Sequence, residues 1–210
     1  LSDKDGWKDE GCLVASKGDR DNWNAIDPNF IVDEKGTPWL TWGSFWDGIQ
    51  MIKLDKKTMH VKKGAKPQTI ARRHAVGDTS VEPNPTSKFA GTNAIEAPFI
   101  MKHGGYYYLF VSWDYCCRGI KSNYRVAVGR SKKVAGPYLD KAGRDMRNGG
   151  GTLLLEGDKK EYEAMGHCSA YSFSDGDYFF CHGYSVAKNG ASILVQKKIN
   201  WTEDGWLTLE

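Results

Sequence analysis

The apolar positions of this 210-residue chain fall in short runs of aromatic and β-branched residues, separated by Gly, Asp and Asn. Such runs predict strands and turns, whereas an amphipathic helix needs apolar residues every three to four positions over about ten or more residues. No segment of the sequence shows that helical spacing convincingly. The pattern therefore predicts an all-β protein.

The predicted strands group into three hairpins, each with a glycine in its turn. Glycine suits these turns because it adopts the positive φ that tight turns require. A further apolar strand follows each hairpin. The predicted pairs are 30–32 with 39–43, 99–102 with 106–112, and 171–173 with 178–182, and the strands that follow are 50–54, 124–130 and 192–196.

The hairpins recur at a nearly constant spacing. A shift of 69 residues places Asp27 on Glu96, and a shift of 71 residues places Glu96 on His167. Units of about 70 residues with about four antiparallel strands are typical of β-propeller blades, whose innermost strands line a central channel. We therefore predict that Asp27, Glu96 and His167 lie around one mouth of that channel. The predicted repeats cover 24–92, 93–163 and 164–210.

Each of these three residues also has an ordinary structural interpretation. Asp27 suits a turn before a strand, and His167 suits a buried histidine with a hydrogen-bond partner. Glu96 is harder to explain in this way, because glutamate is rarely buried without a partner. Their common register favours a functional site over three unrelated structural residues.

Several short phrases of the sequence resemble glycoside hydrolase family 43, in particular its α-L-1,5-arabinanases. The resemblance extends over nearly the whole chain and implies a five-bladed β-propeller, of which this chain supplies about three blades. It also implies hydrolysis, with inversion, of α-1,5-linked L-arabinofuranosyl bonds in arabinan or arabino-oligosaccharides. The phrases are NAIDP at 24–28, GSFWDGI at 43–49, IEAP at 95–98, CCRG at 116–119 and NGGGT at 148–152.

The resemblance also assigns catalytic roles. Members of the family use a general base, an aspartate that positions and tunes the acid, and a glutamate general acid. Asp27 matches the positioning aspartate, Glu96 matches the acid, and His167 matches a histidine near a central metal ion, which implies calcium or sodium in the channel. The base usually lies in a His-Asp-Pro phrase, which this sequence lacks. Asp47 and Asp114 are alternatives within the chain, although loop roles are favoured for both.

We expect the missing N-terminal blades to supply the base, as the rest of the chain, a cleaved segment or another subunit. Three blades alone would leave exposed faces and edge strands that a protein has to cover. The resemblance further implies an extracellular or periplasmic protein. The alternatives left open are endo or exo action, an α-L-arabinofuranosidase or β-xylosidase on the same fold, and a non-catalytic carbohydrate-binding propeller fragment.

Substrate contacts are predicted on loops at the channel mouth, because aromatic faces stack on sugar rings. Trp113 and Tyr115 lie in one such loop, although Trp113 suits packing between blades equally well. Adjacent cysteines in the same loop either form a strained vicinal disulfide or remain thiols. The predicted substrate-binding residues are Asn24, Ser44, Phe45, Trp46, Cys116 and Cys117.

Charge and hydropathy exclude two classes of partner. The chain has 29 Lys and Arg against 26 Asp and Glu, a formal net charge of +3, and its basic residues are dispersed. This distribution does not predict nucleic-acid binding. No apolar run approaches the roughly 20 residues that a membrane-spanning helix needs.

The five cysteines lack zinc-type spacing, and their odd number argues against a complete disulfide framework.

Overall fold

A computed structural model describes residues 6–210, which form three four-stranded antiparallel sheets with strands in chain order. The first sheet contains β1 (Asn29–Val32), β2 (Pro38–Trp42), β3 (Ile49–Lys53) and β4 (Gln68–Ala71). The second contains β5 (Ile95–His103), β6 (Tyr106–Trp113), β7 (Arg125–Ser131) and β8 (Thr152–Glu156). The third contains β9 (Tyr162–Phe173), β10 (Gly176–Ser185), β11 (Ala191–Trp201) and β12 (Leu207–Leu209).

The helical content of the described residues is limited to two short 3-10 turns, η1 (Gly119–Lys121) and η2 (Met146–Asn148). The all-β prediction is therefore confirmed. Within residues 6–210, no helix is long and apolar enough to cross a lipid bilayer.

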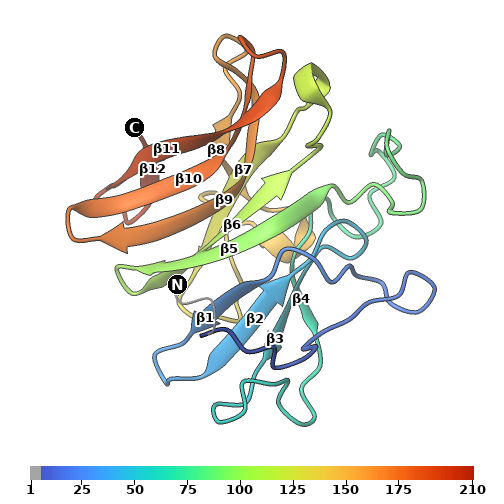
Figure 1. The fold of residues 1–210 in the computed structure, drawn as a ribbon, viewed down its shortest axis with the longest axis vertical. Helices are drawn as coiled ribbons and strands as arrows, with labels where there is room; N and C mark the ends of the chain where they lie inside the picture. The colour runs from blue at the N-terminus through green and yellow to red at the C-terminus, as the bar shows by residue number, and fades with distance from the viewer. Residues whose placement is uncertain (1–5) are drawn as a thin grey trace.

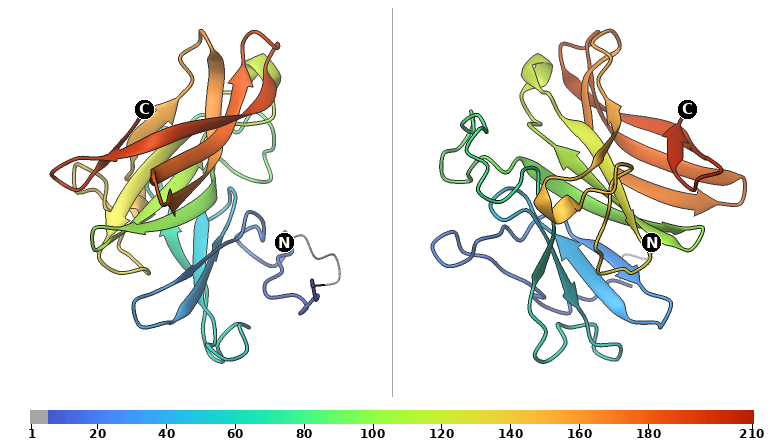
Figure 2. Two further views of the ribbon diagram at one scale, coloured as in Figure 1. Left: turned by 60° about the vertical axis from the view of Figure 1, so that its left-hand side comes forward. Right: turned by 180° about the vertical axis from the view of Figure 1, so that it is seen from behind.

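The three sheets follow one another in space as they do in sequence (Figures 1 and 2). The first strand of the middle sheet, β5, contacts the first strands of both neighbours, β1 and β9. This arrangement is that of successive propeller blades. The predicted boundary at 92/93 falls between β4 and β5, whereas the boundary at 163/164 falls inside β9, which begins at Tyr162.

Alternate residues of β6 hold the sheets together, because successive side chains of a strand point to opposite faces. Tyr107, Leu109 and Val111 pack toward the first sheet. Tyr108 and Phe110 pack toward the third sheet. The middle sheet is therefore covered on both faces, and β6 contributes buried side chains to both cores.

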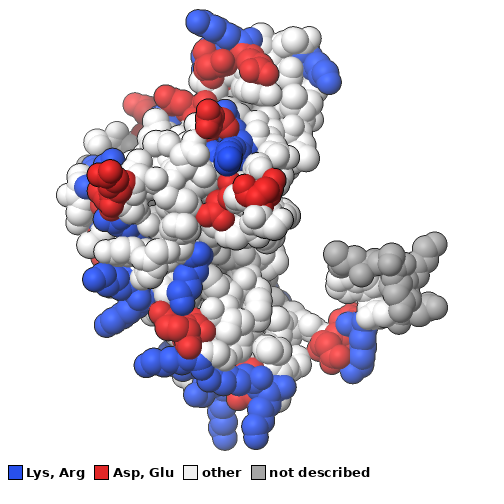
Figure 3. All heavy atoms as spheres, turned by 90° about the vertical axis from the view of Figure 1, so that its left-hand side faces the viewer, with Lys and Arg blue, Asp and Glu red and all other residues white. Residues whose placement is uncertain are grey.

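The two outer sheets leave apolar side chains exposed. Leu194 and Phe173 of the third sheet are 74% and 55% exposed, and Phe30 of the first sheet is 50% exposed. Figure 3 shows acidic and basic side chains interspersed over one side of the molecule, with several basic side chains gathered at its lower end. The exposed apolar residues therefore lie on specific sheets of an otherwise mixed, polar surface.

Each innermost strand has a β-bulge in it or directly before it, at which two residues oppose one on the neighbouring strand. In β5 the bulge lies between Glu96 and Phe99, and in β9 between Gly166 and Ser169. Just before β1, Ile26 accepts a hydrogen bond from the Gly43 N–H at 3.0 Å, while Asn29 pairs with Thr41. The same interruption therefore occurs in all three sheets.

One residue within each bulge has a left-handed backbone: Asp27 (φ 56°), Ala97 (φ 50°) and His167 (φ 52°). These residues are spaced by 70 positions. The predicted superposition of Asp27 on Glu96 and of Glu96 on His167 is therefore wrong by one residue. Glu96 immediately precedes the repeated position, next to Ala97.

The error arises from the hairpin loops. The first hairpin closes after the Asp33–Thr37 pair, which encloses three residues, whereas the second closes at the His103–Tyr106 pair, which encloses two. Matching Gly36 with Gly105 across loops that differ in length shifts the apparent spacing from 70 residues to 69. The third loop also encloses two residues, between Phe173 and Gly176, and the spacing of 71 arises because Gly176 has the place of Tyr106, one residue after Gly105. The bulges, which lie upstream of the loops, keep the true spacing.

Candidate active site

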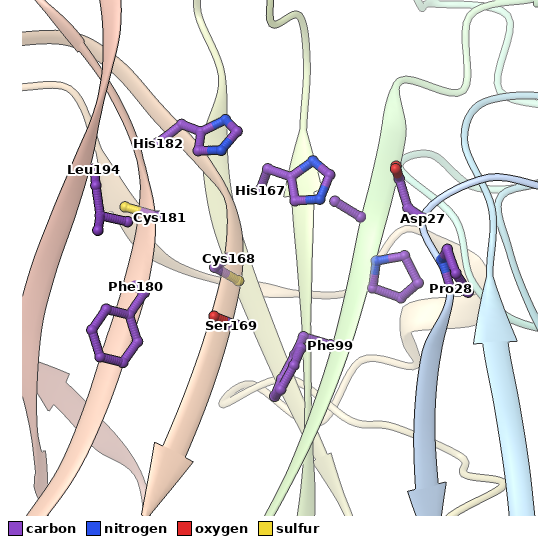
Figure 4. Close-up of a pocket in the computed structure, with 12 residues that line it drawn as sticks. Asp27, Pro28, Phe99, His167, Cys168, Ser169, Phe180, Cys181, His182 and Leu194 are labelled. Carbon is purple, nitrogen blue, oxygen red and sulfur yellow. The ribbon is translucent and has the colours of Figure 1, made fainter. Parts of the chain in front are cut away.

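A cleft of about 470 Å³ opens along the innermost strands. Asp27 enters it from the first bulge and His167 from the third, and both side chains reach toward the same space (Figure 4). A bulge redirects the side chain that it carries, because the extra residue bends and twists the strand. The repeated bulge therefore explains how residues 140 positions apart converge.

Glu96 is held by hydroxyl groups on both of its carboxylate oxygens. An isolated bridge joins Ser44 to Glu96, and the Ser44 hydroxyl donates to Oε2 at 2.8 Å. The Tyr124 hydroxyl donates to Oε1 at 2.5 Å. The side chain of Glu96 is half-buried. A carboxyl group held at both oxygens presents a fixed plane to a substrate.

The three predicted residues lie within electrostatic reach of one another. Burial raises the pKa of Asp27, the charge of His167 lowers it, and the negative charge of Glu96 raises it again. The net result is a pKa above the ordinary value for aspartate. The structure therefore places Asp27 and His167 in the cleft, and Glu96 within electrostatic reach of Asp27, directly before the cleft residue Ala97.

Tyr124 belongs to the site, although the sequence indicated it only as the start of a strand. Burial, the charge of Glu96 and the hydrogen bond to it raise the pKa of Tyr124 well above its usual value. Its hydroxyl therefore remains protonated and acts as a donor. The signal in the sequence was weak, because Tyr124 lies 28 residues beyond Glu96 and one residue before β7.

The predicted aromatic residues lie on the loop that leads from Ser44. Phe45 and Trp46 both have positive φ, and the Phe45 N–H donates to the Ile95 carbonyl at 2.9 Å beside Glu96. The ring of Phe45 packs against Tyr115 at a centroid distance of 6.0 Å. Both loop residues therefore lie close to the acid and remain partly exposed.

Trp113 has a packing role. It is buried in the core between the first and middle sheets, and the Arg73 guanidinium lies over its ring at 4.3 Å. Of the two interpretations that the sequence left open, the structure therefore favours packing. The neighbouring Tyr115 is half-buried and faces Phe45 instead.

Cys116, Cys117 and Asn24 are the remaining residues that the sequence predicted as substrate contacts. Cys116 and Cys117 are free thiols with sulfur atoms 2.6 Å apart, and the Cys117 N–H donates to the Tyr184 hydroxyl at 2.9 Å. Burial, followed by its contacts with Cys117 and Glu96, raises the pKa of Cys116. Asn24 is half-buried, and its carbonyl accepts a hydrogen bond from the Ile26 N–H at 3.1 Å.

The two alternative bases are engaged in ion pairs. Asp47 pairs with Arg72 at 2.7 Å. Asp114 pairs with Arg73 at 2.9 Å and with Arg125 at 2.6 Å. The oxygens of both carboxylates are therefore already engaged in charge-assisted hydrogen bonds with arginine. These contacts give both aspartates the loop role that the sequence favoured.

The residues around His167 set limits on a metal site. Its imidazole is exposed and lies beside His182, with ring centroids 5.5 Å apart and nearly parallel planes. Within residues 6–210, no group of three or more His, Cys, Asp or Glu side chains is arranged to hold an ion. This donor set fits a hydrated cation with His167 as its protein ligand, and it does not fit calcium enclosed by protein oxygens.

The family of this chain follows from its similarity to known proteins. The sequence profile of glycosyl hydrolases family 43 matches residues 2–207. This chain belongs to that family. The extracellular exo-α-(1→5)-L-arabinofuranosidase of Cellvibrio japonicus is 43% identical over 200 residues, which are 95% of this chain and 56% of that protein. The extracellular endo-α-(1→5)-L-arabinanase 1 of Bacillus subtilis is 41% identical over 96% of this chain and 55% of its own length.

Solved structures of family 43 proteins are also similar. An exo-1,5-α-L-arabinanase from a bovine ruminal metagenomic library superposes with a TM-score of 0.87 at 53% identity, over 100% of this chain and 64% of that one. A Cellvibrio cellulosa α-L-arabinanase complexed with arabinohexaose gives a TM-score of 0.86 at 41% identity, over 97% of this chain and 62% of that one. This family 43 chain therefore spans 55% to 64% of the length of these four relatives.

Proposed function

We propose that this chain is part of an arabinan-degrading glycoside hydrolase that cleaves α-1,5-linked L-arabinofuranosyl bonds with inversion. The observation that carries the proposal is the carboxyl group of Glu96, which is held at both oxygens by Ser44 and Tyr124 and lies within electrostatic reach of Asp27 in the cleft. The arabinan-cleaving activities named for the Cellvibrio and Bacillus relatives support the choice of linkage. Because those relatives include exo- and endo-acting enzymes, the proposal specifies the bond and not the mode of attack.

In the proposed reaction, Glu96 donates a proton to the glycosidic oxygen as the bond to the anomeric carbon breaks. A water molecule attacks that carbon from the opposite face, activated by a second carboxylate about 6.5 to 9.5 Å from the acid. Asp27 lies beside Glu96 and positions it. Since Asp47 and Asp114 are paired with arginines, we propose that residues of the protein outside these 210 supply the activating carboxylate.

The proposed architecture is a five-bladed propeller in which residues 1–210 form three blades, over 24–92, 93–163 and 164–210. Two further blades would cover the apolar residues left exposed on the outer sheets, such as Leu194 and Phe30. The shares of 62% and 64% over which this chain matches longer arabinanase structures are in keeping with three blades of five. The partners of this segment are then those blades and the arabinan chain.

The proposal also assigns the residues that contact arabinan and a cation site at His167. Arabinan would lie along the loop aromatics Phe45 and Trp46 and the Cys116–Cys117 pair, near Asn24. A hydrated calcium or sodium ion on His167 would supply positive charge close to the carboxylates when bound. The names of the Cellvibrio japonicus and Bacillus subtilis relatives, both described as extracellular, support an extracellular location.

The test is hydrolysis of debranched arabinan by the full-length protein, followed by proton NMR of the first product. Inversion of an α-linkage predicts that the β-anomer appears first and mutarotates later. Cleavage of aryl xylosides without release of sugar from arabinan would replace the proposal with the xylosidase alternative. Binding of arabinan with no cleavage at all would support the carbohydrate-binding alternative.

A further inference from the structure

Tyr124 contacts Glu96 from a fully enclosed position. Its side chain is 1% exposed, and its hydroxyl lies 2.5 Å from Oε1 of Glu96. The residue immediately precedes β7 in the middle sheet, the same sheet that carries Glu96 on β5. The hydroxyl is therefore a buried polar group whose main partner is the carboxylate.

The third sheet fixes the ring of Tyr124 in this position. The Tyr124 carbonyl accepts a hydrogen bond from the Met165 N–H at 3.0 Å. The ring packs against Gly166, where an added Cβ would lie 2.2 Å from a ring carbon. The ring is therefore packed closely between the middle and third sheets, on the side where Gly166 has no side chain.

The neighbouring polar groups complete a chain of contacts between the sheets. Ser112, which pairs with Glu96 across β5 and β6, accepts a hydrogen bond from the His167 N–H at 2.8 Å. Ser112 is also close enough to Tyr124 to lower the pKa of its hydroxyl, against the larger effects of burial and of Glu96 that raise it. The bulge that carries His167 and the hydroxyl that holds Glu96 are therefore parts of one connected arrangement.

We propose that Tyr124 is a positioning residue for the general acid, and this inference rests on the proposed function. Its hydroxyl holds Oε1 while the Ser44 hydroxyl holds Oε2, so the two groups fix the plane of the carboxyl group and the direction in which it presents its proton. Proton transfer to a leaving oxygen depends steeply on that geometry. Tyr124 acts through Glu96 and has no proton-transfer role of its own.

The matched pair of variants is Tyr124→Phe and Tyr138→Phe, assayed in the full-length protein. Tyr138 is also fully buried, and its hydroxyl donates to the Val134 carbonyl at 2.6 Å, within the core between the first and middle sheets. Each change removes one buried hydroxyl, so both variants should lose similar stability. Tyr124→Phe should lower kcat on arabinan about 10- to 100-fold, the value of a hydrogen bond to a charged group, with KM within about twofold. Tyr138→Phe should keep the parent kcat.

Aryl arabinofuranosides with a nitrophenolate leaving group separate positioning of the acid from general damage. Such a leaving group needs little protonation, so Tyr124→Phe should lose much less activity on these substrates than on arabinan. An equal loss on both, or a parent-like kcat on arabinan, would overturn the proposal. Ser44→Ala removes the other hydroxyl without disturbing the ring packing and should show the same selective loss.

Crystal structures of the parent and of Tyr124→Phe provide a readout that does not depend on activity. We expect the Glu96 carboxylate to rotate away from its position in the parent, and to keep that position in Tyr138→Phe. An unmoved carboxylate in Tyr124→Phe would overturn the positioning role. A parent protein that leaves arabinan intact would instead count against the proposed function, so the two failures are distinguishable.

Discussion

At the residue scale, the site depends on backbone conformations that most residues avoid. Asp27, Ala97 and His167 all have positive φ within a bulge. Such a conformation costs a non-glycine residue roughly 1–2 kcal/mol, although Asp, Asn and His tolerate it better than others. Strain of this kind is usually retained where the surrounding structure and the function require it. The repeated bulge therefore directs the side chains of Asp27 and His167 into the cleft.

Replacing Asp27 with Asn should stabilise the protein above the raised pKa of Asp27. Burial and the nearby Glu96 charge raise that pKa, so ionised Asp27 lowers the stability of the folded state. Below the ordinary aspartate pKa both folded and unfolded states are protonated, and the difference should vanish there. Asn also tolerates the left-handed backbone.

Urea unfolding of the parent and of Asp27→Asn from about pH 3 to pH 8 measures this effect. We expect the two midpoints to coincide in acid, and the variant to become more stable as the pH rises. A variant that is less stable than the parent at neutral pH would show that ionised Asp27 stabilises the fold.

The cation proposed on His167 has a direct test. Calorimetric titration of chelator-treated protein with calcium, and separately with sodium, should detect binding that is lost in His167→Gly. Glycine accepts the left-handed backbone and supplies no side-chain ligand, so the bulge should survive the change. Equal binding by parent and variant would remove His167 from the site. His182→Asn is the control, since this neighbouring ring lies beside His167 on β10.

The sequence predicted the carboxylates of the site better than their surroundings. Asp27 and Glu96 stand in recognisable phrases, and the register of the repeats placed them near one another. Tyr124 could not be predicted, because its direction is set by packing against Gly166 in the next sheet. The engagement of Asp47 and Asp114 by arginines also depends on contacts between segments that are far apart in sequence.

At the element scale, the hairpins were predictable because their turns carry glycine and their strands carry aromatic and β-branched residues. The bulges were not, because an extra residue in a strand leaves no distinct pattern of apolar and polar positions. The strand that begins at Tyr162 illustrates the consequence. The sequence pattern predicted a strand only from Tyr171, whereas β9 begins at Tyr162 and continues through the bulge at His167.

Gly166→Ala tests how the third sheet supports the site. The new Cβ would overlap the Tyr124 ring, and overpacking of this kind typically costs about 1–3 kcal/mol. We expect a lower free energy of unfolding in urea, and an additional loss of kcat on arabinan because Tyr124 is displaced. His167→Asn, one residue further along and exposed, should change the unfolding free energy by less than about 0.5 kcal/mol. Equal stability of Gly166→Ala and the parent would mean that the ring is free to move.

At the scale of the whole molecule, the three sheets form an open arc with uncovered apolar residues at its outer sheets. Exposed apolar surface of this kind marks an interface or an aggregation site. The sequence predicted three repeats, because each repeat contains one recognisable hairpin. It also predicted that the outer faces of a three-blade segment would be exposed. The residues that remain exposed could be identified only from the structure, because the two cores between the sheets show which face of each strand is covered.

The isolated 210-residue chain should self-associate through these residues. Leu194→Lys places a charge on the third sheet and should shift the chain toward monomer in sedimentation velocity at about micromolar concentration. Val76→Lys is a matched control, because Val76 and Leu194 are each 74% exposed and Val76 lies in a loop. A parent chain that is already monomeric, or an equal effect of both variants, would count against an interface on the third sheet.

The central claim is that Glu96 is the proton donor in the cleavage of arabinan. Glu96→Gln keeps the shape of the side chain and removes its acidic proton, so the decisive measurement is kcat of this variant of the full-length protein on two substrates. On arabinan, kcat should fall by about 10²- to 10⁴-fold. On an aryl arabinofuranoside whose leaving group needs no protonation, most of the activity should remain. An unchanged rate on arabinan, or an equal loss on both substrates, would contradict the assignment of Glu96 as the acid.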